Sequence, residues 1–130
     1  MSSSPSQPRP AGVLVVDDER LLLRLLGLAL SQAGFAVWAA HGGEEAVELY
    51  GRHGGVIDVV LLDVCMPGMD GPKTLAALRA LDPAVRCCLL TGHAGAYSEE
   101  GLLALGADRV LLKPFPLDEL AGVLRGLAGR

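Results

Sequence analysis

The sequence predicts an α/β domain built on a parallel β-sheet, and three observations support this. Five short apolar runs are mostly continuous rather than alternating, as strands covered on both faces are. Segments with helical spacing separate these runs, so strand and helix alternate along the chain. With 130 residues, of which 51% are hydrophobic, the chain is long enough for one domain that buries its own core.

The expected elements alternate from a strand near the N-terminus to a helix near the C-terminus. Each strand is an apolar run, and in each helix apolar residues recur every three or four positions. The expected strands are Val13–Val16, Phe35–Trp38, Ile57–Leu62, Cys87–Leu90 and Val110–Leu112, and the expected helices cover 19–33, 43–52, 72–81, 97–105 and 117–127.

Residues between the elements support these limits. Gly34 and Gly106 follow the first and fourth helices, where a glycine commonly ends a helix. Asp82 and Pro83 close the third helix, because proline disfavours a helical conformation at the residue before it. Ser98 caps or begins the fourth helix. The second strand ends in two alanines, as expected of an edge strand away from a site.

The first helix carries more leucine than one core face requires. We expect its core stripe at Leu22, Leu25, Leu26, Ala29 and Leu30. Leu21 and Leu28 lie seven residues apart beside that stripe, and we expect them nearer to solvent. They belong either to a wide core face or to a surface that contacts a partner.

Composition limits the compartment and the kind of partner. Residues 1–10 are rich in serine and proline without an apolar segment, so we expect a disordered tail or linker before a domain at 11–128. The net charge of −4 argues against a direct nucleic-acid partner, and no apolar run approaches the roughly 20 residues of a membrane span. Three cysteines without C-x-x-C spacing fit a reducing, cytoplasmic compartment.

Polar residues stand at the carboxyl ends of four of the expected strands. The first ends in Asp17 and Asp18, the third in Asp63, the fourth in Thr91 and the fifth in Lys113. In open parallel sheets, ligands bind outside these strand ends, at the point where the strand order reverses. We therefore expect three carboxylates, a hydroxyl and an amine to meet in one crevice.

Three neighbouring carboxylates favour a cation. Two unit charges about 4 Å apart repel by about 4 kcal/mol at an effective dielectric constant of 20, and one lysine offsets a single charge. Carboxylate ligands completed by water and phosphate are typical of Mg²⁺. An aspartate can also act as a nucleophile towards phosphorus, and phosphoryl transfer needs mainly positioning and charge neutralisation.

Four segments together resemble the receiver domain of bacterial response regulators. They are V-V-D-D-E at 15–19, D-V-C-M-P-G-M-D-G at 63–71, L-T-G-H-A at 90–94 and L-K-P-F at 112–115. Their order and spacing agree over residues 12–127. The resemblance implies a flavodoxin-like (βα)5 three-layer sandwich, with a five-stranded parallel sheet of order 2-1-3-4-5. It also implies a role in two-component or phosphorelay signalling.

By this resemblance, Asp63 accepts a phosphoryl group from a phosphohistidine on a histidine kinase or histidine phosphotransfer protein. Asp18, Asp63 and the backbone carbonyl of Cys65 would ligate Mg²⁺, with Asp17 acting through a water molecule. Lys113 would pair with Asp63 before phosphorylation and with the phosphoryl oxygens afterwards.

Other roles also follow from the resemblance. Thr91 would move to hydrogen-bond the phosphoryl group, and Cys65 and His93 would modulate its hydrolysis. Val110 stands where the family usually has a tyrosine or phenylalanine, which puts the usual relay of the signal in doubt. Tyr97 is a candidate for part of that role.

The resemblance extends to the turn after Asp63, to the first helix and to the Lys113-Pro114 bond. Gly68 and Gly71 would permit positive φ angles in that turn. In the family the first helix docks the phosphodonor, which assigns Leu21 and Leu28 to a partner contact. The bond between Lys113 and Pro114 is often cis in the family.

Other interpretations of single residues remain open. Asp17, Asp18 and Glu19 could cap the first helix, Lys113 could be an ordinary exposed lysine, and Thr91 could bond its own turn. A thiol nucleophile at Cys65 is a further alternative, although no third orienting group is evident.

The functional alternatives are a phosphorylation-independent interaction module and a metal-dependent phosphohydrolase. The second is disfavoured because Asp63 is followed two positions later by Cys65 rather than by a general acid. The leading hypothesis is a domain that catalyses its own phosphorylation, turns over no external substrate and signals to a downstream effector protein or domain. It is either a stand-alone response regulator or a receiver from a larger protein such as a hybrid histidine kinase.

Overall fold

A computed structural model describes residues 9–92 and 97–129 of the chain. Its five parallel strands form one sheet in the order β2-β1-β3-β4-β5, which confirms the expected fold class and topology. The strands are β1 (Gly12–Val16), β2 (Ala36–Ala40), β3 (Val59–Asp63), β4 (Cys87–Thr91) and β5 (Arg109–Leu112). The helices are α1 (Arg20–Gln32), α2 (Gly43–His53), α3 (Gly71–Leu81), α4 (Glu99–Ala104) and α5 (Leu117–Ala128).

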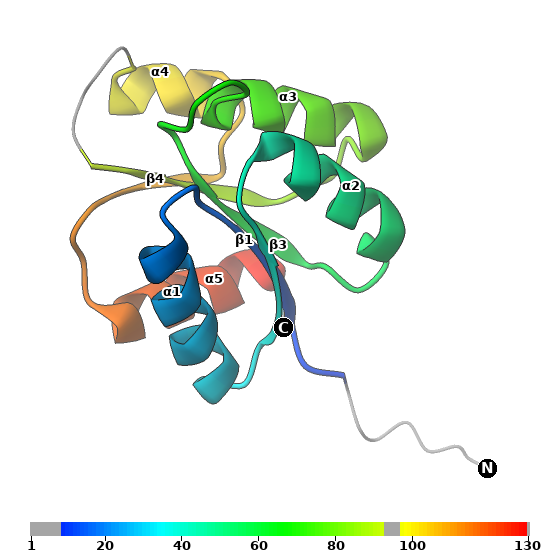
Figure 1. The fold of residues 1–130 in the computed structure, drawn as a ribbon, viewed down its shortest axis with the longest axis vertical. Coiled ribbons are helices and arrows are strands. Elements are labelled where there is room, and N and C mark those ends of the chain that lie inside the picture. The colour runs from blue at the N-terminus through cyan, green and yellow to red at the C-terminus, as the bar shows by residue number, and fades with distance from the viewer. Residues whose placement is uncertain (1–8, 93–96, 130) are drawn as a thin grey trace.

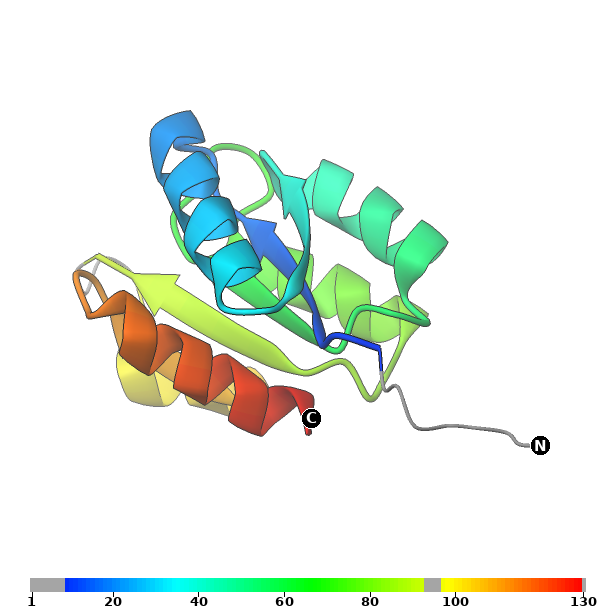
Figure 2. The same cartoon turned by 90° about the horizontal axis from the view of Figure 1, so that it is seen from below.

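The helices cover both faces of the sheet, which gives three layers. Figure 1 shows α2, α3 and α4 on one face and α1 and α5 on the other. In the view of Figure 2, α1 and α5 lie on the face turned towards the reader. Both faces of the central strands are therefore buried, which explains why these strands are continuous apolar runs.

Two hydrophobic clusters, one on each face, form the core. Successive residues of a strand point to opposite faces, so Val13 and Leu14 enter different clusters. Cys87 faces the cluster under α2, α3 and α4, and Cys88 faces the cluster under α1 and α5. The adjacent cysteines thus point to opposite faces, as expected, and both are fully buried.

The core stripe of α1 differs from the expected one. Leu23, Leu26 and Leu30 are buried, whereas Leu25 is 52% exposed and does not belong to the core. Because α1 is leucine-rich on every face, the sequence does not distinguish which leucines point inwards. Leu21 and Leu28 are 72% and 61% exposed, so their expected position near solvent is confirmed.

The predicted helix ends agree with the structure. Gly34 and Gly106 have φ angles of 101° and 108°, in the left-handed region that favours glycine. Ser98 caps α4 by accepting a hydrogen bond from the backbone N–H of Gly101 at 2.9 Å, and α3 ends at Leu81, directly before Asp82.

The segment before β1 is bonded to the segment before β3. Arg9 donates hydrogen bonds of 2.7 and 2.9 Å to the carboxylate of Asp58, and Asp58 Oδ2 accepts another from the N–H of Gly12 at 2.8 Å. The expected tail at 1–10 falls mainly outside the described residues, so its limit stays a prediction. Among the described residues, none of the helices could span a bilayer.

Candidate functional site

Three aspartates meet at the carboxyl edge of the sheet. Asp17 and Asp18 follow β1, and Asp63 is the last residue of β3. Each offers a carboxylate oxygen, and these oxygens lie within 4.8 Å of one another. Asp17 and Asp63 are buried, with 1% and 5% of their surface exposed, whereas Asp18 is exposed. The parallel order that places β1 beside β3 brings these residues together.

Lys113 reaches the same cluster from the end of β5. Its Nζ lies 3.0 Å from Asp63 Oδ1 and 3.4 Å from Asp17 Oδ2, so it donates to both buried carboxylates. The lysine is therefore an internal ion-pair partner and not an ordinary exposed side chain. The peptide bond between Lys113 and Pro114 is cis, as the resemblance implied.

The environment shifts the pKa of both members of the central pair. Burial raises the pKa of Asp63, and the charges of Asp17 and Asp18 raise it further, against the opposing effect of Lys113. Burial by itself lowers the pKa of Lys113, but the hydrogen bond and charge of Asp63, with those of Asp17, raise it above its usual value. For Asp63, the ion pair with Lys113 thus offsets only part of the combined effect of burial and of the neighbouring carboxylates on its pKa.

Asp17 is held in place by hydrogen bonds, but it does not cap α1. The N-cap of α1 is Glu19, and its side chain makes no capping hydrogen bond. Asp17 Oδ1 instead accepts from the N–H of Glu19 at 2.9 Å, and the N–H of Asp17 donates to the carbonyl of Ala40 at 3.1 Å. These bonds hold the turn after β1, which leaves the other oxygen, Oδ2, directed to Lys113.

Thr91 lies at the adjacent strand end. It is the last residue of β4, is 5% exposed and is paired in register with Leu112. Its carbonyl accepts a hydrogen bond from the N–H of Lys113 at 2.8 Å. Asp63 pairs with Leu90, so the threonine stands one residue beyond the register position of the central aspartate.

The turn after β3 needs its two glycines for different reasons. Gly68 has a φ angle of 74°, which confirms the expected left-handed conformation. The same expectation is wrong for Gly71, which is not among the described residues with positive φ. A Cβ atom there would lie 2.6 Å from the carbonyl oxygen of Asp63 and 2.8 Å from Cα of Val64, so Gly71 is required by close packing.

The remaining predicted site residues occupy varied positions. Cys65 is exposed beside the cluster, Val110 is buried under α4, and His93 lies outside the described residues. Sequence reasoning missed the role of Asp70, which caps α3 through a hydrogen bond to the N–H of Lys73 at 3.0 Å. The following Gly-Pro pair, with proline in the first helical turn, was a signal for this cap.

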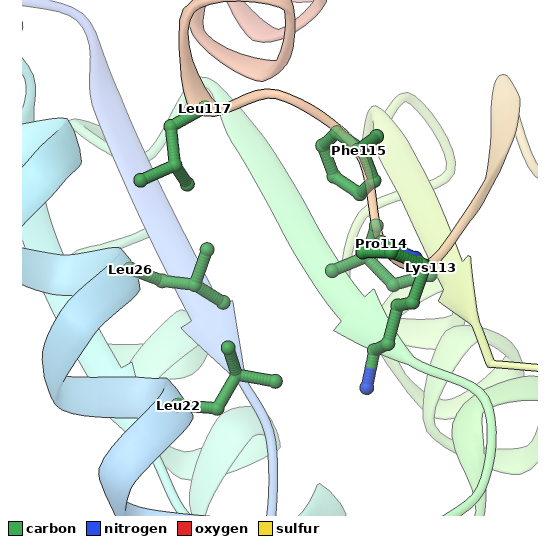
Figure 3. Close-up of a pocket in the computed structure, with 7 residues that line it drawn as sticks. Leu22, Leu26, Lys113, Pro114, Phe115 and Leu117 are labelled. Atoms are coloured by element: carbon green, nitrogen blue, oxygen red, sulfur yellow. The ribbon is translucent and has the colours of Figure 1, made fainter.

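An apolar cavity of about 290 Å³ adjoins the lysine on the side of α1. Figure 3 shows Leu22 and Leu26 of α1 pointing towards the segment that follows β5, while Leu117, the first residue of α5, points into the space between them from above. The residues that line the cavity are Leu22, Leu26, Leu90, Lys113, Pro114, Phe115 and Leu117.

The donor atoms of Asp17, Asp18 and Asp63, which together form the acidic rim of the sheet, suit a hard divalent cation. The three clustered side chains all offer carboxylate oxygens, which are the ligands that Mg²⁺ and Ca²⁺ prefer. A cation there would also relieve the repulsion by Asp17 and Asp18 that adds to burial in raising the pKa of Asp63. The exposed Asp18 leaves the cluster open to solvent on one side.

Curated relatives resemble the chain over most of its length. It is 38% identical over 121 residues to the transcriptional regulatory protein TrcR of Mycobacterium tuberculosis, which covers 93% of this chain and 46% of that protein. It is also 38% identical over 116 residues to the sensor kinase CckA of Brucella abortus, which covers 88% of this chain and 12% of that protein. The chain thus spans about half the length of the regulatory protein and a much smaller share, 12%, of the sensor kinase.

Solved structures share the fold. A response regulator receiver domain from Clostridium thermocellum superposes with a TM-score of 0.86 at 28% identity, covering 92% of this chain and 95% of that one. A response regulator from Burkholderia pseudomallei, solved with a phosphorylated aspartic acid, a calcium ion and citrate, superposes with a TM-score of 0.78 at 29% identity, covering 91% and 68%.

The sequence also matches the response regulator receiver domain family over residues 13–125. Together with the sheet order and the relatives, this match shows that the chain belongs to the receiver domains of two-component systems.

Proposed function

We propose that Asp63 is the phosphoacceptor of this receiver domain. The observation that carries the proposal is the 3.0 Å contact between Asp63 Oδ1 and Lys113 Nζ, inside a cluster of three carboxylates at a strand end. The strand holds the nucleophile rigidly, and the open side of the cluster gives a donor access. A related receiver carries a phosphorylated aspartic acid, which supports the same chemistry here.

The transfer needs few protein groups. A carboxylate oxygen of Asp63 attacks the phosphorus, the phosphorus–nitrogen bond of the phosphohistidine breaks, and the neutral imidazole leaves after it takes up a proton. Lys113 then pairs with the phosphoryl oxygens in place of the aspartate oxygen, and the hydroxyl of Thr91 donates a hydrogen bond to one of them. These residues neutralise charge and orient the transferred group.

Mg²⁺ is the cofactor we propose for the acidic rim. Asp18, Asp63 and the backbone carbonyl of Cys65 would hold it, and Asp17 would act through a water molecule. When bound, Mg²⁺ supplies positive charge that offsets the carboxylates and the phosphoryl oxygens. The exposed thiol of Cys65 and the side chain of His93 would modulate how fast water removes the phosphoryl group.

A histidine kinase or histidine phosphotransfer protein is the proposed donor, and it would dock on α1. Leu21 and Leu28 support this, because both are large apolar side chains with most of their surface exposed. A Leu21→Ser, Leu28→Ser variant should lose transfer from a protein donor but keep labelling by acetyl phosphate. Equal loss with both donors, or unchanged transfer from the protein, would contradict this contact.

The domain modifies itself and turns over no external substrate in this proposal. It would signal in the cytoplasm to a downstream effector protein or to a domain of its own longer chain, without direct contact to nucleic acid. The three unpaired cysteines support a reducing compartment. Relatives that are a transcriptional regulator and a sensor kinase support both a response regulator and a receiver within a kinase.

Incubation with acetyl phosphate and Mg²⁺, followed by intact mass spectrometry, tests the proposal. We expect the gain of one phosphoryl group, its loss in Asp63→Asn, and its loss when EDTA removes Mg²⁺. Asp118→Asn is the matched control, because Asp118 is an exposed acid in the first turn of α5, and it should keep the gain. A gain that survives Asp63→Asn would refute the assignment.

Val110 favours a second candidate, a receiver-like interaction module that works without phosphorylation. The side chain is small, β-branched and buried, so it cannot move as an aromatic ring does. Absence of any phosphoryl gain in the correctly folded wild-type protein, with both small and protein donors, would favour this candidate.

A further inference from the structure

Two tyrosine hydroxyls hold the two ends of α3, each through an aspartate. Tyr97 donates to Asp70 Oδ2 at 3.1 Å, and Tyr50 donates to Asp82 Oδ2 at 2.6 Å. Asp70 is the N-cap of α3 and Asp82 is its C-cap. The bond of Tyr97 adjoins the acidic rim, because α3 begins directly after the turn that follows β3. The bond of Tyr50 lies at the opposite end of the same helix.

Asp70 links this tyrosine to the turn that carries Cys65. One of its oxygens accepts from Tyr97, and the other accepts from the N–H of Lys73. The next residue, Gly71, donates its N–H to the carbonyl of Val64 at 2.9 Å. The loop 64–70 is therefore closed at its base by this backbone bond, and Asp70, next to that bond, fastens the C-terminal end of the loop to Tyr97 and α3.

Tyr97 is itself well placed to hold the loop. It directly precedes Ser98, the N-cap of α4, and its ring packs against the core cluster that α2, α3 and α4 cover. Between the ring and the loop lies an open cavity of about 440 Å³, lined by Val64, Cys65, Met66, Pro67, Asp70 and Tyr97. The loop has free space on this side, so the hydroxyl contact across the cavity limits its movement.

We propose that Tyr97 is a positioning residue for the metal site. Through Asp70 it holds the loop so that the carbonyl of Cys65 stays available to the cation. The inference rests on the proposed function, in which that carbonyl completes the Mg²⁺ ligands. Loss of a contact that orients a metal ligand commonly weakens metal binding, although the contact itself takes no part in the reaction. Binding is reciprocal, so Mg²⁺ should in turn strengthen the bond between Tyr97 and Asp70.

Titration calorimetry of the metal-free protein with Mg²⁺ tests the inference. In Tyr97→Phe we expect the dissociation constant for Mg²⁺ to rise about tenfold, the lower end of the effect of outer contacts on metal sites. The Mg²⁺ concentration that half-saturates labelling by acetyl phosphate should rise by the same factor. The labelling rate at saturating Mg²⁺ should change by less than about twofold, because the chemistry at Asp63 is unaltered.

Tyr50→Phe is the matched control. It removes the same kind of bond from the other end of α3, so it should lower stability and leave Mg²⁺ affinity unchanged. Asp70→Ser keeps an N-cap acceptor for α3 but is too short for the tyrosine, and it should raise the dissociation constant as Tyr97→Phe does. The double variant should bind Mg²⁺ no more weakly than either single variant, because both remove one contact.

Two results would overturn the inference. The first is an unchanged Mg²⁺ affinity in a folded Tyr97→Phe protein, and the second is an equal loss of affinity in Tyr50→Phe. Failure of the proposed function is distinguishable, because in that case the wild-type protein itself would not bind Mg²⁺ or accept a phosphoryl group.

Discussion

The acidic rim should destabilise the metal-free domain, and Asp18→Asn should relieve this. The carboxylate of Asp18 has an oxygen within 4.8 Å of oxygens of Asp17 and Asp63. Among the described residues, Lys113 forms its ion pairs with those two and not with Asp18. Removing the charge of Asp18 therefore removes two repulsions without breaking an ion pair.

The gain in stability of Asp18→Asn follows from the distance between the carboxylate oxygens and from the exposure of Asp18. At 4.8 Å, the upper limit of these separations, two unit charges repel by about 0.9 kcal/mol in water and by about 3.5 kcal/mol at an effective dielectric constant of 20. Asp18 is exposed, so the lower figure applies to each of its two neighbours. The nearby lysine offsets part of the sum, which leaves a gain of about 1 kcal/mol for Asp18→Asn.

Urea unfolding followed by circular dichroism, in EDTA and in excess MgCl₂, measures this effect. In EDTA the variant should be more stable than the wild type. If Asp18 is a ligand of Mg²⁺ as proposed, the order should reverse in MgCl₂, because a ligand at 100 times its dissociation constant stabilises the wild type by about 2.7 kcal/mol and the variant would lack one of the proposed ligands.

Asp118→Asn is the control that distinguishes the repulsion within the acidic rim from a general effect of removing one negative charge. Asp118 lies in the first turn of α5, where a negative charge is favourable, so this variant should lose a few tenths of a kcal/mol in both buffers. An Asp18→Asn protein that is less stable than the wild type in EDTA would show that Asp18 is not repelled by its neighbours, and one that Mg²⁺ stabilises as much as the wild type would show that Asp18 does not bind the cation.

Three further predictions concern packing and pH. Gly71→Ala should destabilise the protein by more than about 2 kcal/mol in urea unfolding, because its Cβ would meet the backbone at the end of β3; an unchanged midpoint would contradict this. Leu26→Ala should cost about 2–5 kcal/mol and Leu25→Ala less than about 0.5 kcal/mol, since the first is buried and the second is exposed; equal losses would mean that α1 is rotated. Hydrogen bonds from Tyr50 and a backbone N–H lower the pKa of Asp82, so the charged carboxylate stabilises the fold above its unfolded pKa of about 3.9 and this contribution disappears as pH falls through the lower folded value. Asp82→Asn should therefore lose stability at pH 7, and its deficit should shrink as pH falls below about 3.9; a deficit that stays constant down to the lowest pH at which both proteins are folded would contradict the role of Asp82.

The site was predictable from the sequence because its residues stand at strand ends. In a parallel sheet those ends share one edge, so Asp17, Asp63 and Lys113 had to lie close together once the order of strands was known. The strand order itself came from the resemblance of four segments and not from periodicity.

Details that depend on packing were not predictable. Seven of the thirteen residues of α1 are leucine, so periodicity did not identify its inward face, and Leu23 was missed. Gly71 carried the same signal as Gly68, although one is needed for close contact and the other for its φ angle. Tyr97 and Asp70 are 27 residues apart, and no local pattern indicates their hydrogen bond.

If Asp63 is the phosphoacceptor, as proposed, the phosphoryl group is attached to its carboxylate and to no other acid of the acidic rim. Borohydride reduces the carbonyl of an aspartyl phosphate and releases phosphate, which converts the labelled residue into homoserine, and peptide sequencing by mass spectrometry then locates it. We expect homoserine at position 63 and aspartate at positions 17 and 18. Homoserine at either of those two positions, or at another acid with position 63 unchanged, would show that Asp63 is not the phosphoacceptor.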